Sequence, residues 1–262
     1  MTQTSPTRSA AGFTLIELLV VLGIIGVLTA ITLPSLKNIR KANVMVSAGR
    51  QLVDDFALAR ARAISERTTV HVMFVPPEIR GWTFSTDAGA DGERDRKLGE
   101  RLKGSQFISY ALYAERSVGD QPGRPRSRYL TSWRTLPEGI FIDTNKFLNR
   151  VVAPGNPPYY GRPFEYVPLP FPTVAGKTWP VPHIAFTPEG RLSTTNLTLS
   201  FLNEAIQLGR GSVFVERGPA GSFIDFDLSE NPKGNATDTN NFHRVVVDAL
   251  TGRGRVETPQ IQ

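Results

Sequence analysis

A long apolar run near the start of the chain constrains its fold more than any other feature. The run extends from Phe13 to Leu36 and holds one charged residue, Glu17. As a helix rising about 1.5 Å per residue it would be about 36 Å long, which is enough to span a bilayer. A carboxylate inside such a span costs roughly 2.5 to 3.5 kcal/mol on insertion scales, so Glu17 requires a partner and a functional reason.

The run does not have the pattern of a secretory signal peptide. Such a peptide has a basic region, a shorter apolar core and a small-residue cleavage site after the core. Here Arg8 is the one basic residue ahead of the run, and no Ala-x-Ala site follows it. We therefore predict a transmembrane helix at 13–36.

Residues 1–12, the Gly12/Phe13 junction and the string from Phe13 to Glu17 resemble the N-terminal signal of type IV prepilins and of type II secretion pseudopilins. The resemblance combines Gly before the junction, Phe after it and Glu as the fifth residue of the resulting chain. It implies that 1–12 is a leader peptide, that a prepilin peptidase cleaves after Gly12, and that the new amino terminus of Phe13 is N-methylated.

The resemblance also implies a role for Glu17 in assembly. Cleavage would create an amine on Phe13 with a pKa of about 7.7 to 8.0, mostly cationic at neutral pH. In a low dielectric, a cation beside a carboxylate relieves much of the cost of burying it. The resemblance implies that Glu17 meets the Phe13 amine of a neighbouring subunit. The simpler alternative is that Glu17 reaches the nearby cytoplasmic interface.

The apolar run continues into a second helical segment, which gives one helix over 13–66. Pro34 removes a backbone donor, so we expect a kink near Ile31 to Pro34. Apolar residues then recur at three- and four-residue spacings, and we expect this stripe to pack on the domain that follows. The stripe consists of Leu36, Ile39, Val46, Leu52, Val53, Phe56, Ala59, Ala63 and Ile64. The opposite face, which we expect to be solvated, holds Lys37, Arg40, Lys41, Arg50, Asp54, Asp55, Arg60 and Arg62.

Two rules disagree on membrane topology. Lys37, Arg40 and Lys41 follow the span and outnumber Arg8, so the positive-inside rule favours the far end in the cytoplasm. The cleavage motif favours a cytoplasmic leader and a periplasmic domain, and we follow the motif. The prediction is a single-pass protein of the inner membrane that later enters a periplasmic pseudopilus or a surface filament.

The remaining residues, 67–262, are predicted to form one β-rich domain. Residues 69–75 alternate in polarity, and 81–85 follows a Pro76-Pro77 turn, so these segments are predicted to form a hairpin. Many short strands separated by Gly and Pro favour an antiparallel sandwich or barrel-like sheet, and hence an α+β fold. Further strands are expected at 107–113, 139–143, 183–186, 196–201, 212–217, 222–228 and 243–248.

Four later segments narrow the resemblance to the H-type minor pseudopilins of type II secretion and related minor pilins. They are Leu52–Ile64, Leu136–Ile140, Ile184–Arg191 and Val245–Val256. The resemblance implies a sandwich of two antiparallel sheets packed beside the helix. Gly190 and Gly252 suit turns that need positive φ.

Two segments depart from that pattern. The charged segment 87–103 is predicted to be a solvated hairpin tip, with a calcium site as the alternative. The segment 154–188 holds ten of the 20 prolines and several aromatics. It cannot form the interior of a regular sheet, and we interpret it as an extended loop laid over the domain or as an exposed recognition surface.

No pattern for catalysis or cofactor binding is found. His71, His183 and His243 are isolated, there is no cysteine, and motifs for metal, acyl-transfer or phosphate chemistry are absent. We therefore expect a non-enzymatic protein without cofactor or metal.

The sequence predicts a minor pseudopilin that takes part in protein secretion. Its partners would be the prepilin peptidase, other pseudopilins, an inner-membrane assembly platform and membrane lipid. The alternative is a minor type IV pilin in a pilus or DNA-uptake machine. In that case four basic residues beside Tyr129 and Trp133 would contact DNA phosphates. They are Arg124, Arg126, Arg128 and Arg134.

Overall fold

The computed structural model describes residues 15–84, 90–117, 119–120, 126–148, 162–194, 202–219, 223–238, 240 and 242–259, with the backbone alone at 30–43 and at Ala90. The chain divides into two compact units, Met1–Asn43 and Val44–Gln262. Each unit is described by itself.

The predicted N-terminal helix is present as α1 (Leu15–Glu66). It begins within the first unit and ends within the second. Pro34 lies inside it, and the kink expected there stays a prediction.

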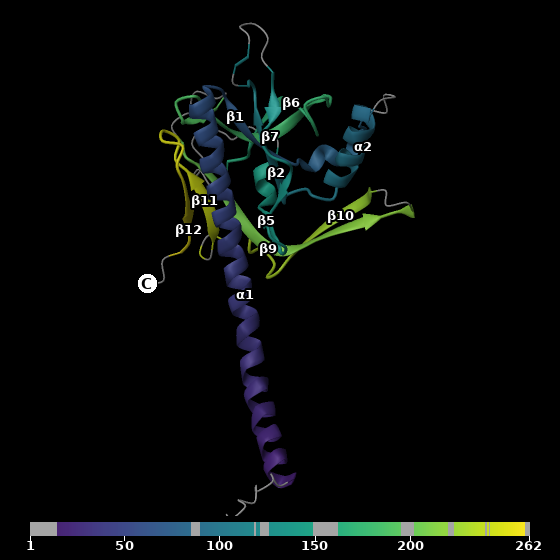
Figure 1. The fold of residues 1–262 in the computed structure, drawn as a ribbon, viewed down its shortest axis with the longest axis vertical. Helices are drawn as coiled ribbons and strands as arrows, with labels where there is room; N and C mark the ends of the chain where they lie inside the picture. The colour runs from purple at the N-terminus through teal and green to yellow at the C-terminus, as the bar shows by residue number, and fades with distance from the viewer. Residues whose placement is uncertain are drawn as a thin grey trace, which may run out of the picture. The chain divides into compact units, whose positions relative to one another are not determined.

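The described strands of the second unit form two antiparallel sheets (Figure 1). In the larger sheet the order is β3-β2-β1-β7-β6, with β4 paired to β2 and β8 paired to β7. Its strands are β1 (Val70–Phe74), β2 (Ser109–Ala114), β3 (Arg128–Tyr129), β4 (Arg134–Thr135), β6 (Glu165–Pro170), β7 (Thr178–Phe186) and β8 (Leu192–Ser193). In the smaller sheet the order is β10-β9-β11-β12, with β5 paired to β9. Its strands are β5 (Ile140–Ile142), β9 (Glu204–Arg217), β10 (Phe223–Glu230), β11 (His243–Val247) and β12 (Gly254–Glu257). The predicted α+β class is confirmed.

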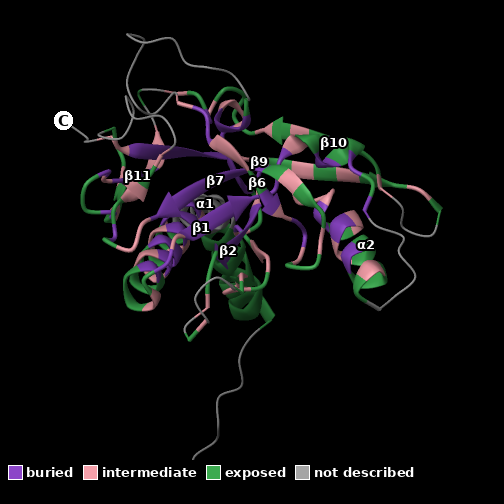
Figure 2. Ribbon diagram, turned by 90° about the horizontal axis from the view of Figure 1, so that it is seen from above, coloured by how far each residue is buried: buried purple, intermediate pink, exposed green. Residues whose placement is uncertain are grey.

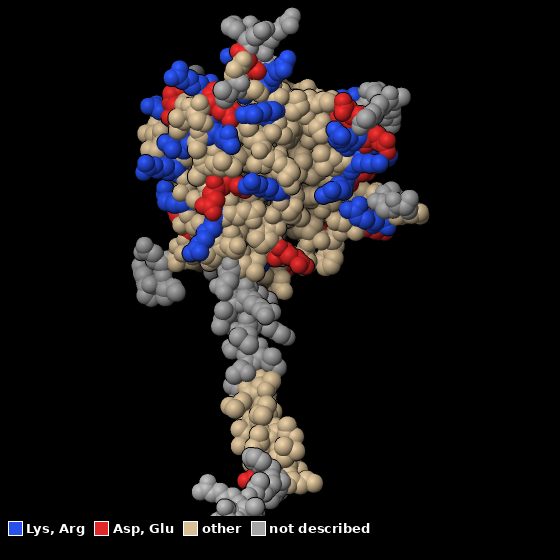
Figure 3. Space-filling view, viewed as in Figure 1, with Lys and Arg blue, Asp and Glu red and all other residues tan. Residues whose placement is uncertain are grey.

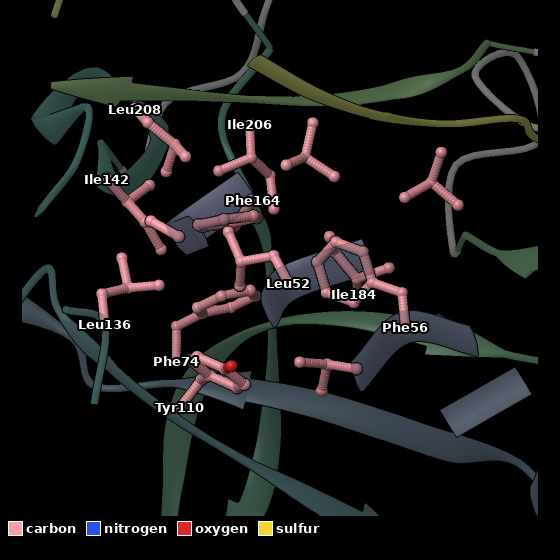
Figure 4. Packing of buried hydrophobic residues seen from close by; sticks show 14 of the residues in the cluster. Leu52, Phe56, Phe74, Tyr110, Leu136, Ile142, Phe164, Ile184, Ile206 and Leu208 are labelled. Atoms are coloured by element: carbon pink, nitrogen blue, oxygen red, sulfur yellow. The ribbon is translucent and has the colours of Figure 1, made fainter. Parts of the chain in front are cut away.

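The main core joins the second half of α1 to both sheets. Fully buried residues of α1 recur one turn apart, among them Leu52 and Phe56. Figure 4 shows Leu52 between Ile206 of the smaller sheet and Phe74 and Tyr110 of the larger one. The predicted apolar stripe is therefore confirmed at its centre.

Other parts of the predicted stripe need correction, whereas Leu36 and Ile39 lie where the side chains are outside the described residues. Met45 and Ala48 enter the core, while Ile64 is 41% exposed. Asp55, which was expected on the solvated face, is buried. The apolar pattern alone could not show this, because the Asp55 carboxylate is held by the buried Tyr110 and by Arg134, which are far from it in sequence.

Strand β1 lies at the centre of the larger sheet and is buried on both faces (Figure 2). Val72 and Phe74 belong to the main core, whereas Met73 belongs to a second apolar cluster on the other face. The alternating residues of 69–75 therefore point to two different faces of the sheet, and both faces are buried.

The predicted hairpin partner of β1, at 81–85, is wrong. Residues Pro77–Gly81 form a 3₁₀ turn, η1, with Pro77 in its first turn. The strands that pair with β1 are β2 and β7. Trp82 and Phe84 do alternate, but they insert into the second cluster without joining a sheet.

The charged segment 87–103 contains a helix, α2 (Ala90–Leu102), and is not a hairpin tip. Glu93 and Lys97 form an ion pair one turn apart at 2.7 Å, and Leu102 is buried in the second cluster. Helical spacing of charges on one face and leucines on another explains the difference.

The proline-rich segment forms the β6–β7 hairpin over its described part, so the interpretation as a loop is wrong there. Pro180 and Pro182 pair with β6 alone, because β1 pairs with β7 from His183 onward. β6 is an edge strand, which is where proline is tolerated. The prolines are thus outside the sheet interior, as expected.

The other predicted strands correspond to β2, β5, β7, β9, β10 and β11, although β7 and β9 are longer than predicted. The strand predicted at 196–201 lies outside the described residues. The short 3₁₀ segment η2 (Thr144–Phe147) follows β5.

Two glycine turns close against the end of α1. Gly190 and Gly252 have φ of 77° and 62°, as expected for turn positions that favour glycine. Arg60 Nε donates to the carbonyl oxygens of Gly190 at 3.1 Å and Thr251 at 2.7 Å. The turns and the helix are therefore joined by direct hydrogen bonds.

We expect Gly252→Ala to lower the free energy of unfolding by about 3 kcal/mol. A Cβ at this position would lie 2.1 Å from the Gly190 carbonyl oxygen. Overpacking and a left-handed backbone each cost about 1 to 2 kcal/mol or more. The measurement is chemical denaturation of the full chain in detergent.

Gly234→Ala is the matched control. Its φ is 78°, but an added Cβ would contact nothing within 4 Å, so the expected loss is about 1 kcal/mol. Equal losses in the two variants would contradict the proposed close approach at Gly252.

Candidate functional site

The structure describes the predicted N-terminal signal from Leu15 onward. Gly12 and Phe13 lie outside the described residues, so cleavage and N-methylation stay predictions. Glu17 lies in the first turn of α1 and is exposed. The positive end of the helix dipole favours a carboxylate at this position.

The helix surface around Glu17 is apolar on every side. From Leu15 to Leu28, the large apolar side chains are 46 to 82% exposed. Figure 3 shows the described part of this segment almost entirely in the colour of uncharged residues. A helix that is apolar all round requires cover from lipid or from other protein chains.

Two glycines in this segment leave room for another helix. A Cβ added at Gly23 or at Gly26 would contact nothing within 4 Å. These glycines are therefore not required by packing among the described residues. Small residues on an apolar helix allow close approach of a second helix in a membrane.

Among the residues that the structure describes, no helix is both long enough and apolar enough to cross a membrane. The transmembrane helix at 13–36 stays a prediction.

A buried polar network links α1 to the larger sheet. The Tyr110 hydroxyl donates to Asp55 Oδ2 at 2.6 Å, and Arg134 pairs with Asp55 Oδ1. Gln51 Nε2 donates to the Tyr110 oxygen at 2.9 Å. Burial and the Asp55 carboxylate raise the pKa of Tyr110, so the phenol stays protonated and keeps donating.

Some of the arginines proposed to bind DNA form ion pairs with carboxylates of α1. Arg134 pairs with Asp55, and Arg128 pairs with Glu66 at 2.8 Å. Arg126 is exposed, and Arg124 lies outside the described residues. Two of the four positive charges are therefore balanced by helix carboxylates, which weakens the basis for a phosphate-binding surface.

Tyr129 and Trp133, the aromatics beside these arginines, are partly buried. The Tyr129 hydroxyl donates to the Pro170 carbonyl at 2.8 Å, and Trp133 Nε1 donates to that of Pro172 at 3.0 Å. Both rings pack against the second apolar cluster. Base stacking would require exposed ring faces.

A buried cluster of charges was not predicted from the sequence. Lys146 is 1% exposed and pairs with Glu204, and Arg162 pairs with the other oxygen of the same carboxylate. Burial lowers the pKa of Lys146, and the charge of Glu204 partly offsets this effect. Removing one partner would leave an uncompensated buried charge, so the three groups depend on one another.

Two histidines, predicted to be ordinary strand residues, face each other on neighbouring strands. The rings of His71 and His183 are 5.0 Å apart, and His71 Nε2 lies 2.9 Å from Glu115 Oε1. Burial first and His71 second lower the pKa of His183 to about 4, so it is neutral at pH 7. In the described part of the chain, no group of three or more His, Cys, Asp or Glu is placed to hold a metal ion.

Residues 7–33 match the family described as the prokaryotic N-terminal methylation motif. This motif is typical of pilin-like structural subunits, which are not enzymes. No curated protein matches the chain. Among solved structures, the chain is similar to the type IV minor pilin FimU of Pseudomonas aeruginosa strain PAO1. The identity is 9% over 84% of this chain and 91% of that chain, with a TM-score of 0.32.

We expect Arg134→Ala to lower the free energy of unfolding by about 2 kcal/mol, because the buried Asp55 carboxylate loses a charged partner. Arg126→Ala is the matched control, and it should change stability by less than about 0.5 kcal/mol. Both are measured by denaturation of the full chain in detergent.

The same variants test the DNA-binding alternative. We expect each variant to bind fluorescent DNA as the unchanged chain does, both at low salt and at high salt. Salt-dependent binding that both substitutions weaken would contradict a purely structural role for Arg134.

Proposed function

We propose that this chain is a minor pseudopilin, cleaved after Gly12, N-methylated on Phe13 and assembled into a filament through its apolar helix. The observation that carries the proposal is the match of residues 7–33 to the N-terminal methylation motif. The exposed apolar surface from Leu15 to Leu28 supports it, because this surface needs neighbours.

The finer assignment is an H-type subunit of a type II secretion pseudopilus. It is supported by the resemblance of Ile184–Arg191 and Val245–Val256 to that family. In this proposal the two sheets form the sandwich of the pseudopilin fold. The precursor spans the inner membrane once, with the leader in the cytoplasm and the domain in the periplasm. Its partners are the prepilin peptidase, an assembly platform, membrane lipid and other pseudopilins.

Glu17 gives assembly its electrostatic selectivity. A carboxylate that leaves water requires a cation close by, and cleavage creates one on Phe13 of each processed chain. An unprocessed chain has no amine at this position, so pairing would favour processed subunits.

We expect Glu17→Gln to be cleaved and methylated normally. Its entry into filaments should fall at least about tenfold, because each 1.4 kcal/mol of lost pairing energy lowers the equilibrium constant by a factor of ten. Intact-mass analysis of the amino terminus measures processing. The fraction of chain in sheared filaments measures assembly. Glu17→Asp, which keeps the charge, is the matched control and should retain most assembly.

Two results would contradict the proposal. Normal filament entry by Glu17→Gln would exclude pairing as the basis of assembly. An uncut Gly12/Phe13 junction in cells with active prepilin peptidase would remove the basis for the whole assignment.

A further inference from the structure

An open hollow in the second unit is lined by residues of β9 and β11, by Met45 of α1 and by the turn at 232–235. Its volume is about 250 Å³, and most of the side chains that line it are polar or charged. The apolar members, Met45 and Leu208, are 3% and 2% exposed, so they offer the hollow little apolar surface. The hollow therefore suits a small charged ligand.

Two cationic side chains, Arg210 and Lys233, line this hollow. Neither forms an ion pair with any residue that the structure describes. Arg210 is half-buried on β9, whereas Lys233 is exposed on the turn. Cations that meet in a hollow without a paired anion create a positive field that attracts an anionic ligand.

His243 adds an unsatisfied polar atom to the wall of the hollow. Its Nδ1 is buried and has no hydrogen-bond partner among the described residues. Burial first and the charge of Arg210 second lower the pKa of His243, so the ring is neutral at pH 7. An anion bound nearby would raise this pKa again, which makes the ring a reporter of binding.

One side chain fixes the turn that carries Lys233 against β9. Asn235 Oδ1 accepts from the Arg210 backbone N–H at 2.5 Å, and Asn235 Nδ2 donates to the Arg210 carbonyl at 2.7 Å. The same Nδ2 donates to the Pro232 carbonyl at 2.6 Å. The backbone segments that carry the two cations are therefore held together before a ligand arrives, and such preorganisation lowers the cost of binding.

The hollow also contains a carboxylate, that of Asp238. Its Oδ1 accepts from the Asn240 N–H at 2.8 Å, and the Asp238 backbone carbonyl accepts from Gln207 Nε2 at 3.0 Å. A carboxylate repels a simple anion but attracts a cationic group. The lining therefore matches a ligand that has a phosphate and an ammonium group a few bonds apart.

We propose that this hollow binds a phosphoethanolamine group, with its phosphate beside Arg210 and Lys233 and its ammonium beside Asp238. A cavity of about 150 Å³ accepts benzene, so the volume of this hollow is sufficient for a slightly larger group. Phosphatidylethanolamine in a membrane and soluble phosphoethanolamine compounds share this chemistry.

A membrane lipid is the source that the chain itself brings within reach. Met45 follows Leu36, the last residue of the apolar run, by nine residues. Even a fully extended chain therefore keeps Met45 within about 32 Å of that run. Lys37, Arg40 and Lys41 lie in between, and basic residues beside a membrane span attract the phosphates of lipids. The choice of a lipid rests on the proposed function, which anchors the precursor in the membrane.

The direct test is a titration of the purified full chain, in a nonionic detergent without phosphate, with glycerophosphoethanolamine. This compound has the headgroup of the lipid without its acyl chains. Proton NMR of the His243 ring, assigned by its loss in His243→Gln, measures binding. We expect saturable shifts of the His243 signals, with those of His71 and His183 unchanged. The absence of a shift at His243 would overturn the proposal.

Substitution of the exposed lysine tests the phosphate contact. Lys233→Gln should weaken binding at least about tenfold, because a charge-assisted contact to the phosphate is lost. Lys177→Gln, the same change at an exposed lysine outside the hollow, is the matched control and should leave binding unchanged. Equal binding by the two variants would overturn the assignment of the phosphate to this hollow.

A change of headgroup tests the role of Asp238. Glycerophosphoglycerol has the same phosphate diester without the ammonium, and it should bind at least about fivefold more weakly, because it gains nothing from the carboxylate. Asp238→Asn should abolish this preference. Equal binding of the two compounds by the unchanged chain would contradict a zwitterionic ligand and would indicate a general anion site.

Micelles that contain phosphatidylethanolamine distinguish the two sources. We expect the lipid to shift the His243 signals at a total concentration at which glycerophosphoethanolamine leaves them in place, because the micelle concentrates the lipid around the apolar helix. Shifts with the soluble compound alone would contradict the lipid as the ligand.

Processing is scored separately, by intact-mass analysis of the same chain produced in cells with prepilin peptidase. If Gly12/Phe13 is cut and His243 shows no shift, this inference fails and the proposed function stands. If the junction is uncut, the proposed function fails, whereas binding by the purified chain is still decided by the titration.

Discussion

The packing of the second half of α1 between strands of both sheets is the interaction on which the domain depends. Leu52 and Phe56 fill the space between the sheets, and Ala59 and Ala63 are fully buried in the same core. Each buried leucine or phenylalanine of this kind contributes about 1.5 to 3 kcal/mol by burial alone. Because both sheets use the same helix surface, neither can complete its apolar face without α1.

The same helix has two apolar surfaces, of which one is covered by the domain and the other is exposed. Met45 to Ala63 present a narrow apolar stripe with polar residues beside it, and the domain covers that stripe. Leu15 to Leu28 are apolar on all sides and uncovered. A stripe one face wide is satisfied inside a chain, whereas an all-round apolar surface requires other molecules. The functional proposal follows from this difference.

The spacing of apolar residues in the sequence predicted the elements whose formation depends on neighbouring residues. The helix, β1, β5 and β11 follow from residues within a few positions of one another. The helix α2 was missed because its charges were interpreted as a loop, although the spacing of Glu93 and Lys97 contains the helical signal. The pairs Asp55–Arg134 and Lys146–Glu204 join residues 79 and 58 positions apart, so no local pattern could reveal them. For the site, the motif around Glu17 could be recognised from the sequence, whereas the ion pairs of Arg128 and Arg134 with carboxylates of α1 could not.

The segments that carry the H-type resemblance contribute to closing the fold. Ile184–Arg191 includes Gly190, and Val245–Val256 includes Gly252, and both turns meet Arg60 at the end of α1. Gly190 and Gly252 themselves are buried, and their positions show how the two sheets join the helix. Other parts of the domain are not constrained by this closure. The ribbon of β9 and β10 is such an element, because Phe214 is exposed on it and Glu216 lies directly opposite Asp225 on the same face.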